Sequence, residues 1–408
     1  MLALPFVALL LVIALAPLAA PRWWHHNRNK ALVALVVSAP ILVYLGINAP
    51  DLLREKVHEY VGFIVVIGAL FVVTGGIHIQ GSLAGTPLVN TGMLGIGAVL
   101  ANLLGTTGAS VLLIRPLLRA NKRRKRVAHI VIFFIFIVAN CGGLLTPMGD
   151  PPLLLGFLKG VPFDWTLRLW PQWLMINGIL LVIFNLWDQW ALDKDEKEVL
   201  IHEPLRITGG VEILVLLGII VTIVLAGSKL VIVALALLGY FAGSGERRAE
   251  NAFTFGPIIE VAVLFAAIFV TMTPVLEMLN AWARRPDFAL TRPWHFFWAS
   301  GSLSSVLDNA PTYLAFAASA AGLQGVAPHG AYIGTLALDP VAAKLLAAIS
   351  TGSVFMGANT YIGNAPNFMV RAIAEENGVK MPSFFGYLAY SVGILLPLFV
   401  LVSLVFFT

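Results

Sequence analysis

The stretch SLSSVLDNAPTYLAF, residues 302–316, decides which fold the chain can adopt. It lies within a long apolar region, yet Asp308, Asn309 and Pro311 fall together at its centre. In hydrocarbon every backbone N–H and C=O needs a partner, so a proline break is tolerated there only against protein or a wet cavity. The stretch therefore predicts a broken helix or a re-entrant hairpin that places Asp308 at a polar site rather than in lipid.

The composition indicates a membrane protein. The chain has 408 residues, of which 59% are hydrophobic and 12% charged, and its mean hydropathy is +0.89. These values are too apolar for a soluble domain of this length. Apolar segments of about 20 residues recur from end to end and leave no interval long enough for a separate soluble domain. We therefore expect an all-α polytopic membrane protein whose main partner is the lipid bilayer.

The charged and reactive residues exclude several classes of function. The formal net charge of +5 comes largely from short loops, where Lys and Arg set membrane orientation, so no nucleic-acid partner is expected. Cys141 is the single cysteine and has no partner for a disulfide or a thiolate metal site. No Walker A, HExxH or GxSxG motif occurs. We therefore expect neither an enzyme nor an ATP-driven pump, and no cofactor besides a transported or coupling Na+.

Apolar segments predict about ten transmembrane helices and two re-entrant hairpins. The hairpins are expected over 91–119 and 295–322, because each is apolar on both sides of a polar centre. Residues 1–20 lack a basic start and lead to no signal-peptidase site, which indicates a first transmembrane helix. The helices are expected near 3–20, 31–48, 61–79, 127–158, 172–190, 209–226, 229–243, 255–280, 341–374 and 386–407.

Loop charges favour hairpins over simple crossings for the two polar-centred segments. If both return to the side from which they entered, most loop Lys and Arg residues share one side, including the tract RANKRRKR at 119–126. The positive-inside rule makes that side cytoplasmic and puts both termini outside the cytoplasm, in a protein of the cell inner membrane. We interpret KRRKR as a signal for orientation and for lipid headgroups.

The same pattern predicts an inverted repeat. A first unit over 1–190 and a second over 209–408 each contain three helices, a hairpin, a broken helix and a closing helix, joined by a cytoplasmic linker over 191–208. Five crossings per unit is an odd number, so the two units must have opposite orientations in the membrane. LLGTTGA at 103–109 aligns with VLDNAPT at 306–312, and GDPPL at 149–153 with GNAPN at 363–367. Such repeats are the usual plan of secondary transporters, with the site where discontinuous helices meet.

Polar residues gather at four interruptions of these helices: ANLLGTTGA, ANCGGLLTPMGDPP, SSVLDNAPT and GANTYIGNAPN. Two of them contain carboxylates, Asp150 and Asp308, which are costly within a bilayer and indicate groups that exchange a proton for a cation. The alternative for each is a helix cap that accepts from free N–H groups. The neutral oxygens expected to bind cation or substrate belong to Asn102, Thr106, Thr107, Asn140, Thr146, Ser305, Asn309, Thr312, Asn359, Thr360, Asn364 and Asn367.

Three of these segments resemble the signatures of the ion transporter superfamily: ANCGGLLTPMGDPPLLLGF, SSVLDNAPTYLAF and GNAPNFMVRAIAEENGV. That superfamily includes NhaD-type sodium/proton antiporters, arsenite carriers and citrate or dicarboxylate carriers. The resemblance covers the chain from about residue 61 onward. It implies a scaffold, a mobile transport subdomain, an elevator motion and a homodimer. The hairpin-tip motif falls on 102–107 and 305–309, and the broken-helix motif on 149–152 and 363–367. Dicarboxylate carriers usually have Ser-Asn-Thr at both tips, which this chain lacks.

Three functions follow as hypotheses. The first is a sodium/proton antiporter that works by alternating access, with Asp308 and Asp150 exchanging H+ and Na+, and with Na+ held at Asp308, Asn309 and Asn364. The second is a proton- or sodium-coupled carrier of a small organic anion such as citrate or a dicarboxylate. The third is a channel or a scaffold without transport. Two buried carboxylates would repel a di- or tricarboxylate, so the residues favour the antiporter.

Overall fold

The computed structural model describes residues 2–192, 203–225 and 227–408. Helices form nearly all of its regular structure, as the apolar spans predict. The first half contains α1 (Leu4–Ala19), α2 (Pro21–Trp24), α3 (Asn27–Asn48), α4 (Pro50–Thr74), β1 (His78–Ser82), α5 (Pro87–Ala120), α6 (Ala128–Ile137), the 3₁₀ helix η1 (Cys141–Leu144), α7 (Pro151–Leu158), η2 (Phe163–Leu169) and α8 (Trp170–Ala191).

The second half of the described chain begins at residue 203. It contains β2 (Glu203–Thr208), α10 (Gly210–Val224), α11 (Lys229–Ala242), α12 (Gly245–Glu250), α13 (Gly256–Ala283), α14 (Pro293–Ser304), α15 (Asn309–Leu323), α16 (Tyr332–Leu338), α17 (Ala342–Met356), η3 (Gly357–Asn359), α18 (Ala365–Glu376) and α19 (Phe384–Phe406).

Within the described ranges, six helices are long and apolar enough to cross a membrane: Asn27–Asn48, Pro50–Thr74, Pro87–Ala120, Phe163–Ala191, Gly256–Ala283 and Phe384–Phe406. A seventh counts if Tyr332–Leu338 and Ala342–Asn359, which are bent by 114°, form one span. Shorter apolar helices fall at other predicted crossings, namely Leu4–Pro17, Ala128–Leu144, Gly210–Val224 and Lys229–Ala242. The all-α polytopic membrane fold is confirmed.

The long element α5 is a hairpin rather than a single span. Gly105, near its middle, has φ +74°, a backbone conformation that glycine adopts readily and that interrupts a helix. The two ends of α5 then meet: Asn90 Nδ2 donates to Asn121 Oδ1 at 3.0 Å, and Asn121 Nδ2 donates to Asn90 Oδ1 at 2.8 Å. A straight helix of 34 residues would separate its ends by about 50 Å. The chain therefore returns to the side from which it entered.

The second hairpin consists of α14 and α15. The rings of Phe296 and Phe316, one from each arm, lie 6.4 Å apart between centroids. The tip between the arms contains Ser305 and Asp308. The polar centre quoted at the outset is therefore the turn of a re-entrant hairpin.

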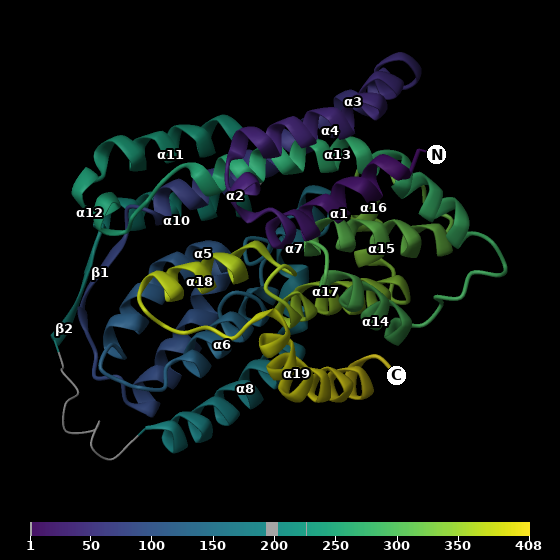
Figure 1. Cartoon of the computed structure of the whole chain (residues 1–408). Helices are drawn as coiled ribbons and strands as arrows, with labels where there is room; N and C mark the ends of the chain where they lie inside the picture. Colours follow the sequence, from purple (N-terminus) through teal and green to yellow (C-terminus); the bar gives the residue numbers. More distant parts are fainter. Residues whose placement is uncertain (1, 193–202, 226) are drawn as a thin grey trace.

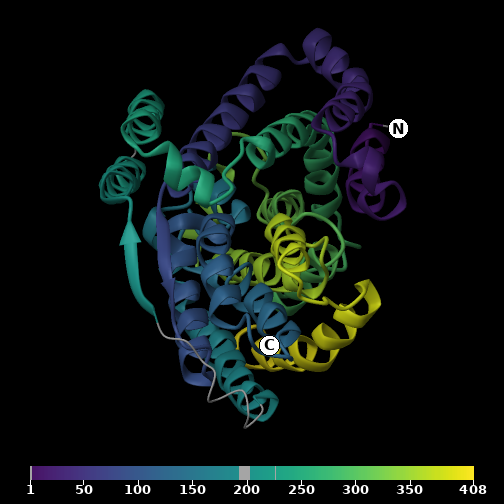
Figure 2. The same ribbon diagram turned by 60° about the vertical axis from the view of Figure 1, so that its left-hand side comes forward.

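Figure 1 shows how these elements are layered. Helices α3, α4, α11 and α13 lie along the upper edge, α8 and α19 along the lower edge, and α5, α6, α17 and α18 between them. In the turned view of Figure 2 the arch of α3 and α4 stands out at the top. The interrupted elements thus lie inside the molecule, where protein can satisfy their freed backbone groups.

One predicted helix has the wrong bounds. The helix expected over 61–79 runs from Pro50 to Thr74, because a proline at its first position starts it and the charged turns 51–59 continue it. Residues 78–82 instead form β1, which pairs antiparallel with β2, with His78 opposite Thr208. Of the expected linker 191–208, residues 193–202 lie outside the described residues and 203–208 form β2.

Within the tract KRRKR, Arg124 makes structural contacts that the sequence does not predict, and the orientation role of the tract stays a prediction. The Arg124 side chain is fully buried at the base of the first hairpin and makes two contacts with the carboxylate of Asp188, at 2.5 Å and 3.0 Å. His129 Nε2 lies 2.8 Å from the same carboxylate. This ion cluster joins the end of α5 and the start of α6 to α8.

Candidate functional site

Each broken helix folds around a pair of glycines six residues apart. In the first, a Cβ on Gly149 would overlap the carbonyl oxygen of Gly143; in the second, a Cβ on Gly363 would lie 2.6 Å from the carbonyl oxygen of Gly357. Only hydrogen at these positions permits the close approach of the two backbone segments. The matched geometry supports the predicted relation between the two repeats, whose boundaries stay a prediction.

The first hairpin tip is pinned to the first broken helix. Asn102 Nδ2 donates to Gly142 O at 2.8 Å, and Asn102 Oδ1 accepts from Leu145 N at 2.8 Å. The hydroxyl of Thr146 donates to the carbonyl of Asn102. These residues, predicted as ligands, therefore hold the tip in place.

The second tip repeats the arrangement. Ser305 Oγ donates to Met356 O at 3.2 Å, and Thr360 Oγ1 donates to Ser305 O at 2.6 Å. Asn359 Nδ2 donates to Ser305 Oγ at 2.9 Å. Thr146 and Thr360 each stand three residues before the second glycine of their own break, so the two tips are held by equivalent hydroxyls.

Asp150 is the centre at which the interrupted elements meet. Its side chain is buried, with 1% exposure. Thr106 from the first hairpin donates to Oδ1 at 2.8 Å, Asn364 from the second broken helix donates to Oδ1 at 3.3 Å, and Asn309 from the second hairpin donates to Oδ2. Both hairpins and both broken helices thus contribute to one carboxylate.

Asparagines extend this centre. Asn364 Nδ2 also donates to Asn140 Oδ1 at 3.2 Å, and Asn140 Nδ2 donates to Asn367 Oδ1 at 2.7 Å. Asn367 is anchored in turn by donating to the carbonyl of Thr360 at 2.9 Å. Asn309 Oδ1 is buried and has no hydrogen-bond partner among the described residues. An unpaired buried oxygen beside a carboxylate is a candidate ligand for a small hard cation.

Backbone dipoles favour an anionic group at this centre. Asp150 precedes α7, Asn364 precedes α18, Asn309 begins α15, and Thr106 follows the break in α5. Each helix N-terminus carries a partial positive charge from its free N–H groups. Four such ends surround the Asp150 carboxylate and offset part of the cost of burying its charge.

Asp308, the other predicted exchanger, has a different setting. It is half-buried and precedes α15, where Ala310 N donates to its Oδ1 at 3.0 Å. Its carbonyl accepts from Thr312 Oγ1 at 2.9 Å. These contacts are those of a helix cap, the alternative stated above for both carboxylates. Among the predicted residues, the centre therefore gathers Thr106, Asn140, Asp150, Asn309, Asn364 and Asn367. Beside it, Asp308 caps α15 and Thr312 donates to the Asp308 carbonyl.

A cavity of about 80 Å³ opens beside Asp150. One wall comes from the first hairpin and the first broken helix and includes Gly105, Thr106 and Thr107. An apolar part of the lining comes from α4 and α13, with Ile67, Leu70, Phe71, Pro257, Ile258 and Val261. The sequence does not reveal these wall residues, because an apolar side chain that lines a cavity has the same pattern as one that faces lipid. The volume suits a few waters or a small ion.

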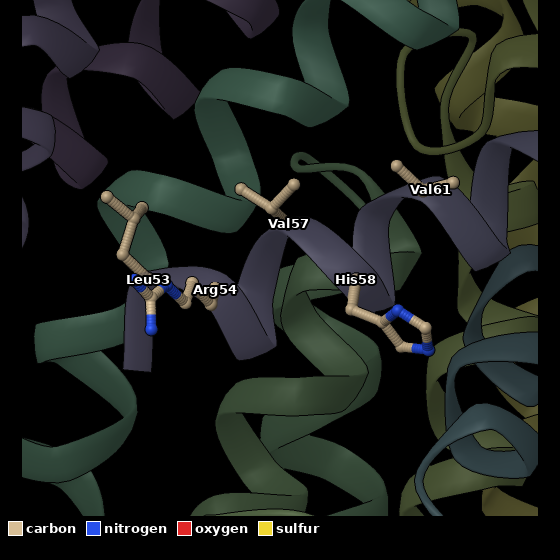
Figure 3. Close-up of a pocket in the computed structure, with 5 residues that line it drawn as sticks. All are labelled: Leu53, Arg54, Val57, His58 and Val61. Atoms are coloured by element: carbon tan, nitrogen blue, oxygen red, sulfur yellow. The ribbon is translucent and has the colours of Figure 1, made fainter. Parts of the chain in front are cut away.

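A second hollow lies on the surface of α4 and is lined by Leu53, Arg54, Val57, His58 and Val61 (Figure 3). All five residues come from one helix, and the space of about 420 Å³ is wide open. Its lining includes no predicted site residue. We therefore place the candidate site at Asp150.

The hairpins, the broken helices and the buried polar centre are the architecture of a secondary membrane transporter. A family model described as "Putative citrate transport" matches residues 1–407. The chain belongs to this family, which confirms the predicted resemblance to citrate-transporter-like members of the ion transporter superfamily. A comparison with curated proteins finds no match.

Gly149→Ala and Gly363→Ala are expected to destabilise the protein, because the added methyl group meets backbone that cannot move aside. Overpacking of this kind costs about 1–3 kcal/mol of the free energy of unfolding, occasionally more. Thermal unfolding in detergent measures the loss. Gly178→Ala is the matched control, since a Cβ there meets no atom within 4 Å. Equal melting temperatures for all three variants would refute the close-packed glycine pairs.

Proposed function

We propose that this transporter exchanges Na+ for H+ by alternating access, with Asp150 binding the two ions in turn. The observation that carries the proposal is the setting of Asp150: a carboxylate with 1% exposure, held by Thr106, Asn309 and Asn364 and bordering a small cavity. A buried carboxylate needs a proton or a cation whenever its surroundings do not compensate its charge.

The groups around Asp150 suit both ions. Protonation removes the charge of the carboxylate and leaves its hydroxyl able to donate to a neighbouring oxygen. Na+ binding would use a carboxylate oxygen together with Thr106 Oγ1 and the unpaired Asn309 Oδ1, which are the oxygen ligands that hard cations prefer. Because both ions use the same carboxylate, binding of one displaces the other, which is the requirement for exchange.

The family description favours a second candidate, the transport of citrate or a related organic anion. Four converging helix N-termini can also receive an anion. However, the side chains that bond to Asp150 in the described structure are hydroxyl and amide groups, and the carboxylate would repel a tricarboxylate. A citrate carrier would therefore need a proton or Na+ at Asp150 before its substrate binds.

Other features of the proposed transporter rest on resemblance and on loop charge. The resemblance to the superfamily supports an elevator motion and a homodimer. The loop charges support an inner-membrane location with both termini outside the cytoplasm. Figure 1 places both ends of the chain on the same side of the molecule, opposite the β1–β2 ribbon.

Purified protein in proteoliposomes separates the two functions. With an imposed pH gradient and a pH-sensitive dye inside, we expect external Na+ or Li+ to collapse the gradient, whereas choline does not. Radiolabelled citrate should not accumulate under the same gradient. Citrate uptake without Na+-dependent proton movement would replace the first function by the second, and the absence of both would refute transport of either cargo.

A further inference from the structure

A compact group of charges, in which both lysines are buried, joins α4 to the C-terminal end of α7. Lys159 Nζ lies 2.6 Å from Glu59 Oε1, and the two side chains are 2% and 13% exposed. Lys56, with a side chain 3% exposed, lies 3.2 Å from Glu59 Oε2 and 3.4 Å from Glu55 Oε1. The group balances two positive and two negative charges.

The backbone and ammonium of Lys159 are both fixed. Lys159 O accepts from Gly334 N at 3.0 Å, and Lys159 Nζ lies 5.2 Å from the centre of the Tyr332 ring. Gly160, with φ +91°, turns the chain immediately afterwards against Ala331. The end of α7 is thus held between α4 on one side and the start of α16 on the other.

Helix α7 connects this charge group to the candidate site. Asp150 precedes the first residue of α7 and Lys159 follows the last, so a helix of eight residues, about 12 Å long, separates them. A short unbroken helix moves as one body. Helix α4 carries Glu59 and also supplies Ile67, Leu70 and Phe71 to the lining of the cavity beside Asp150, which Pro151 and Leu154 of α7 line as well. The ion pair therefore ties together two helices, α4 and α7, that both line the cavity.

A buried ion pair suits a contact that forms in one conformation and breaks in another. Its attraction offsets its desolvation only while the geometry is good, so the pair adds little net stability, but its partners are costly to separate while they stay buried. Lys159 and Glu59 thus form the kind of contact expected to be either fully made or fully broken.

We propose that the Glu59–Lys159 pair is a latch that holds α7 against α4 in this conformation and opens when access to Asp150 changes sides. The latch rests on the proposed function only in requiring alternating access, whichever ion or anion is carried. Glu59 and Lys159 are positioning residues, because they act on the site through α7.

Crosslinking tests whether the latch opens. Glu59→Cys and Lys159→Cys are combined in a Cys141→Ala background and joined by a short bis-methanethiosulfonate reagent. Transport, measured as the Na+-driven collapse of the pH gradient, should fall at least about fivefold on crosslinking, which is the size of effect that coupled sites show. It should recover when dithiothreitol cleaves the link. Asp51→Cys with Arg54→Cys is the control, because both residues lie on α4 and their link spans no moving boundary. An unchanged rate in the crosslinked Glu59/Lys159 protein would overturn the latch.

A second measurement needs no cargo. In the same Cys141→Ala background, Ile67→Cys places a thiol on the α4 part of the cavity lining, and its rate of modification by a maleimide reports how open the cavity is. Glu59→Gln should change that rate at least about fivefold, whereas Glu59→Asp, which keeps a carboxylate between Lys159 and Lys56, should change it less. An unchanged rate in Glu59→Gln would overturn the latch even if the exchange of Na+ for H+ is established. A changed rate in a protein that moves neither Na+ nor citrate would support the latch and refute the proposed function.

Discussion

Asp150→Asn should abolish Na+-driven proton exchange while the protein still folds. An amide has the size and shape of the carboxylate but can neither take up a proton near neutral pH nor hold Na+ by charge. The fold itself accommodates an amide here, because Asn364 occupies the matching position, directly before the half-helix α18 of the second repeat. The lost activity would therefore report the lost charge rather than a collapsed site.

The measurement is the dye assay in proteoliposomes, with thermal unfolding in detergent as the check on folding. Asp308→Asn is the matched control, since it changes a half-buried carboxylate of the adjacent hairpin tip. An asparagine can still cap α15, so we expect that variant to keep most of its exchange activity. The opposite result, with Asp308→Asn inactive and Asp150→Asn active, would assign the exchanging group to the hairpin tip and refute the role given to Asp150.

The broken elements could be predicted because membrane depth makes polar residues conspicuous. Gly105, Asp150, Asp308 and Asn364 interrupt apolar runs, and hydrocarbon leaves few explanations for such residues besides a turn, a cap or a site. The similarity of GDPPL to GNAPN also predicted that the interruptions form matched pairs. The hairpins and the membrane fold followed from these local signals.

The choice between the two carboxylates could not be made in the same way. Asp150 and Asp308 both stand at the start of a half-helix, so their local sequences make similar predictions. The difference lies in what reaches each from elsewhere: Asn309, 159 residues further along the chain, donates to Asp150. Similarly, the sequence around Arg124 indicates only a basic loop. The burial of the Arg124 side chain depends on Asp188, which lies 64 residues away.

The buried pair of Arg124 and Asp188 is expected to have the second large effect, which is on the free energy of unfolding. Arg124 and Asp188 are both fully buried, and the carboxylate also accepts from Asn90 Nδ2 at 2.9 Å. Asp188→Asn removes one charge and leaves the guanidinium without its ionic partner inside the protein. Breaking a buried pair in this way costs about 3–5 kcal/mol of the free energy of unfolding. We expect a clear fall in the melting temperature in detergent.

A comparison of Arg124 with Lys122, in the same basic tract, shows whether burial or charge alone causes the loss of stability. Lys122 lies two residues before Arg124 but is exposed, so Lys122→Ala should leave the melting temperature nearly unchanged. Arg124→Leu combined with Asp188→Leu should recover part of the stability lost in Asp188→Asn, since no unpaired charge remains. If Asp188→Asn and Lys122→Ala both melted at the wild-type temperature, the Arg124–Asp188 pair would not stabilise the base of the first hairpin. Because that base holds both arms of α5 against α8, its loss should also free the tip that carries Thr106 to Asp150.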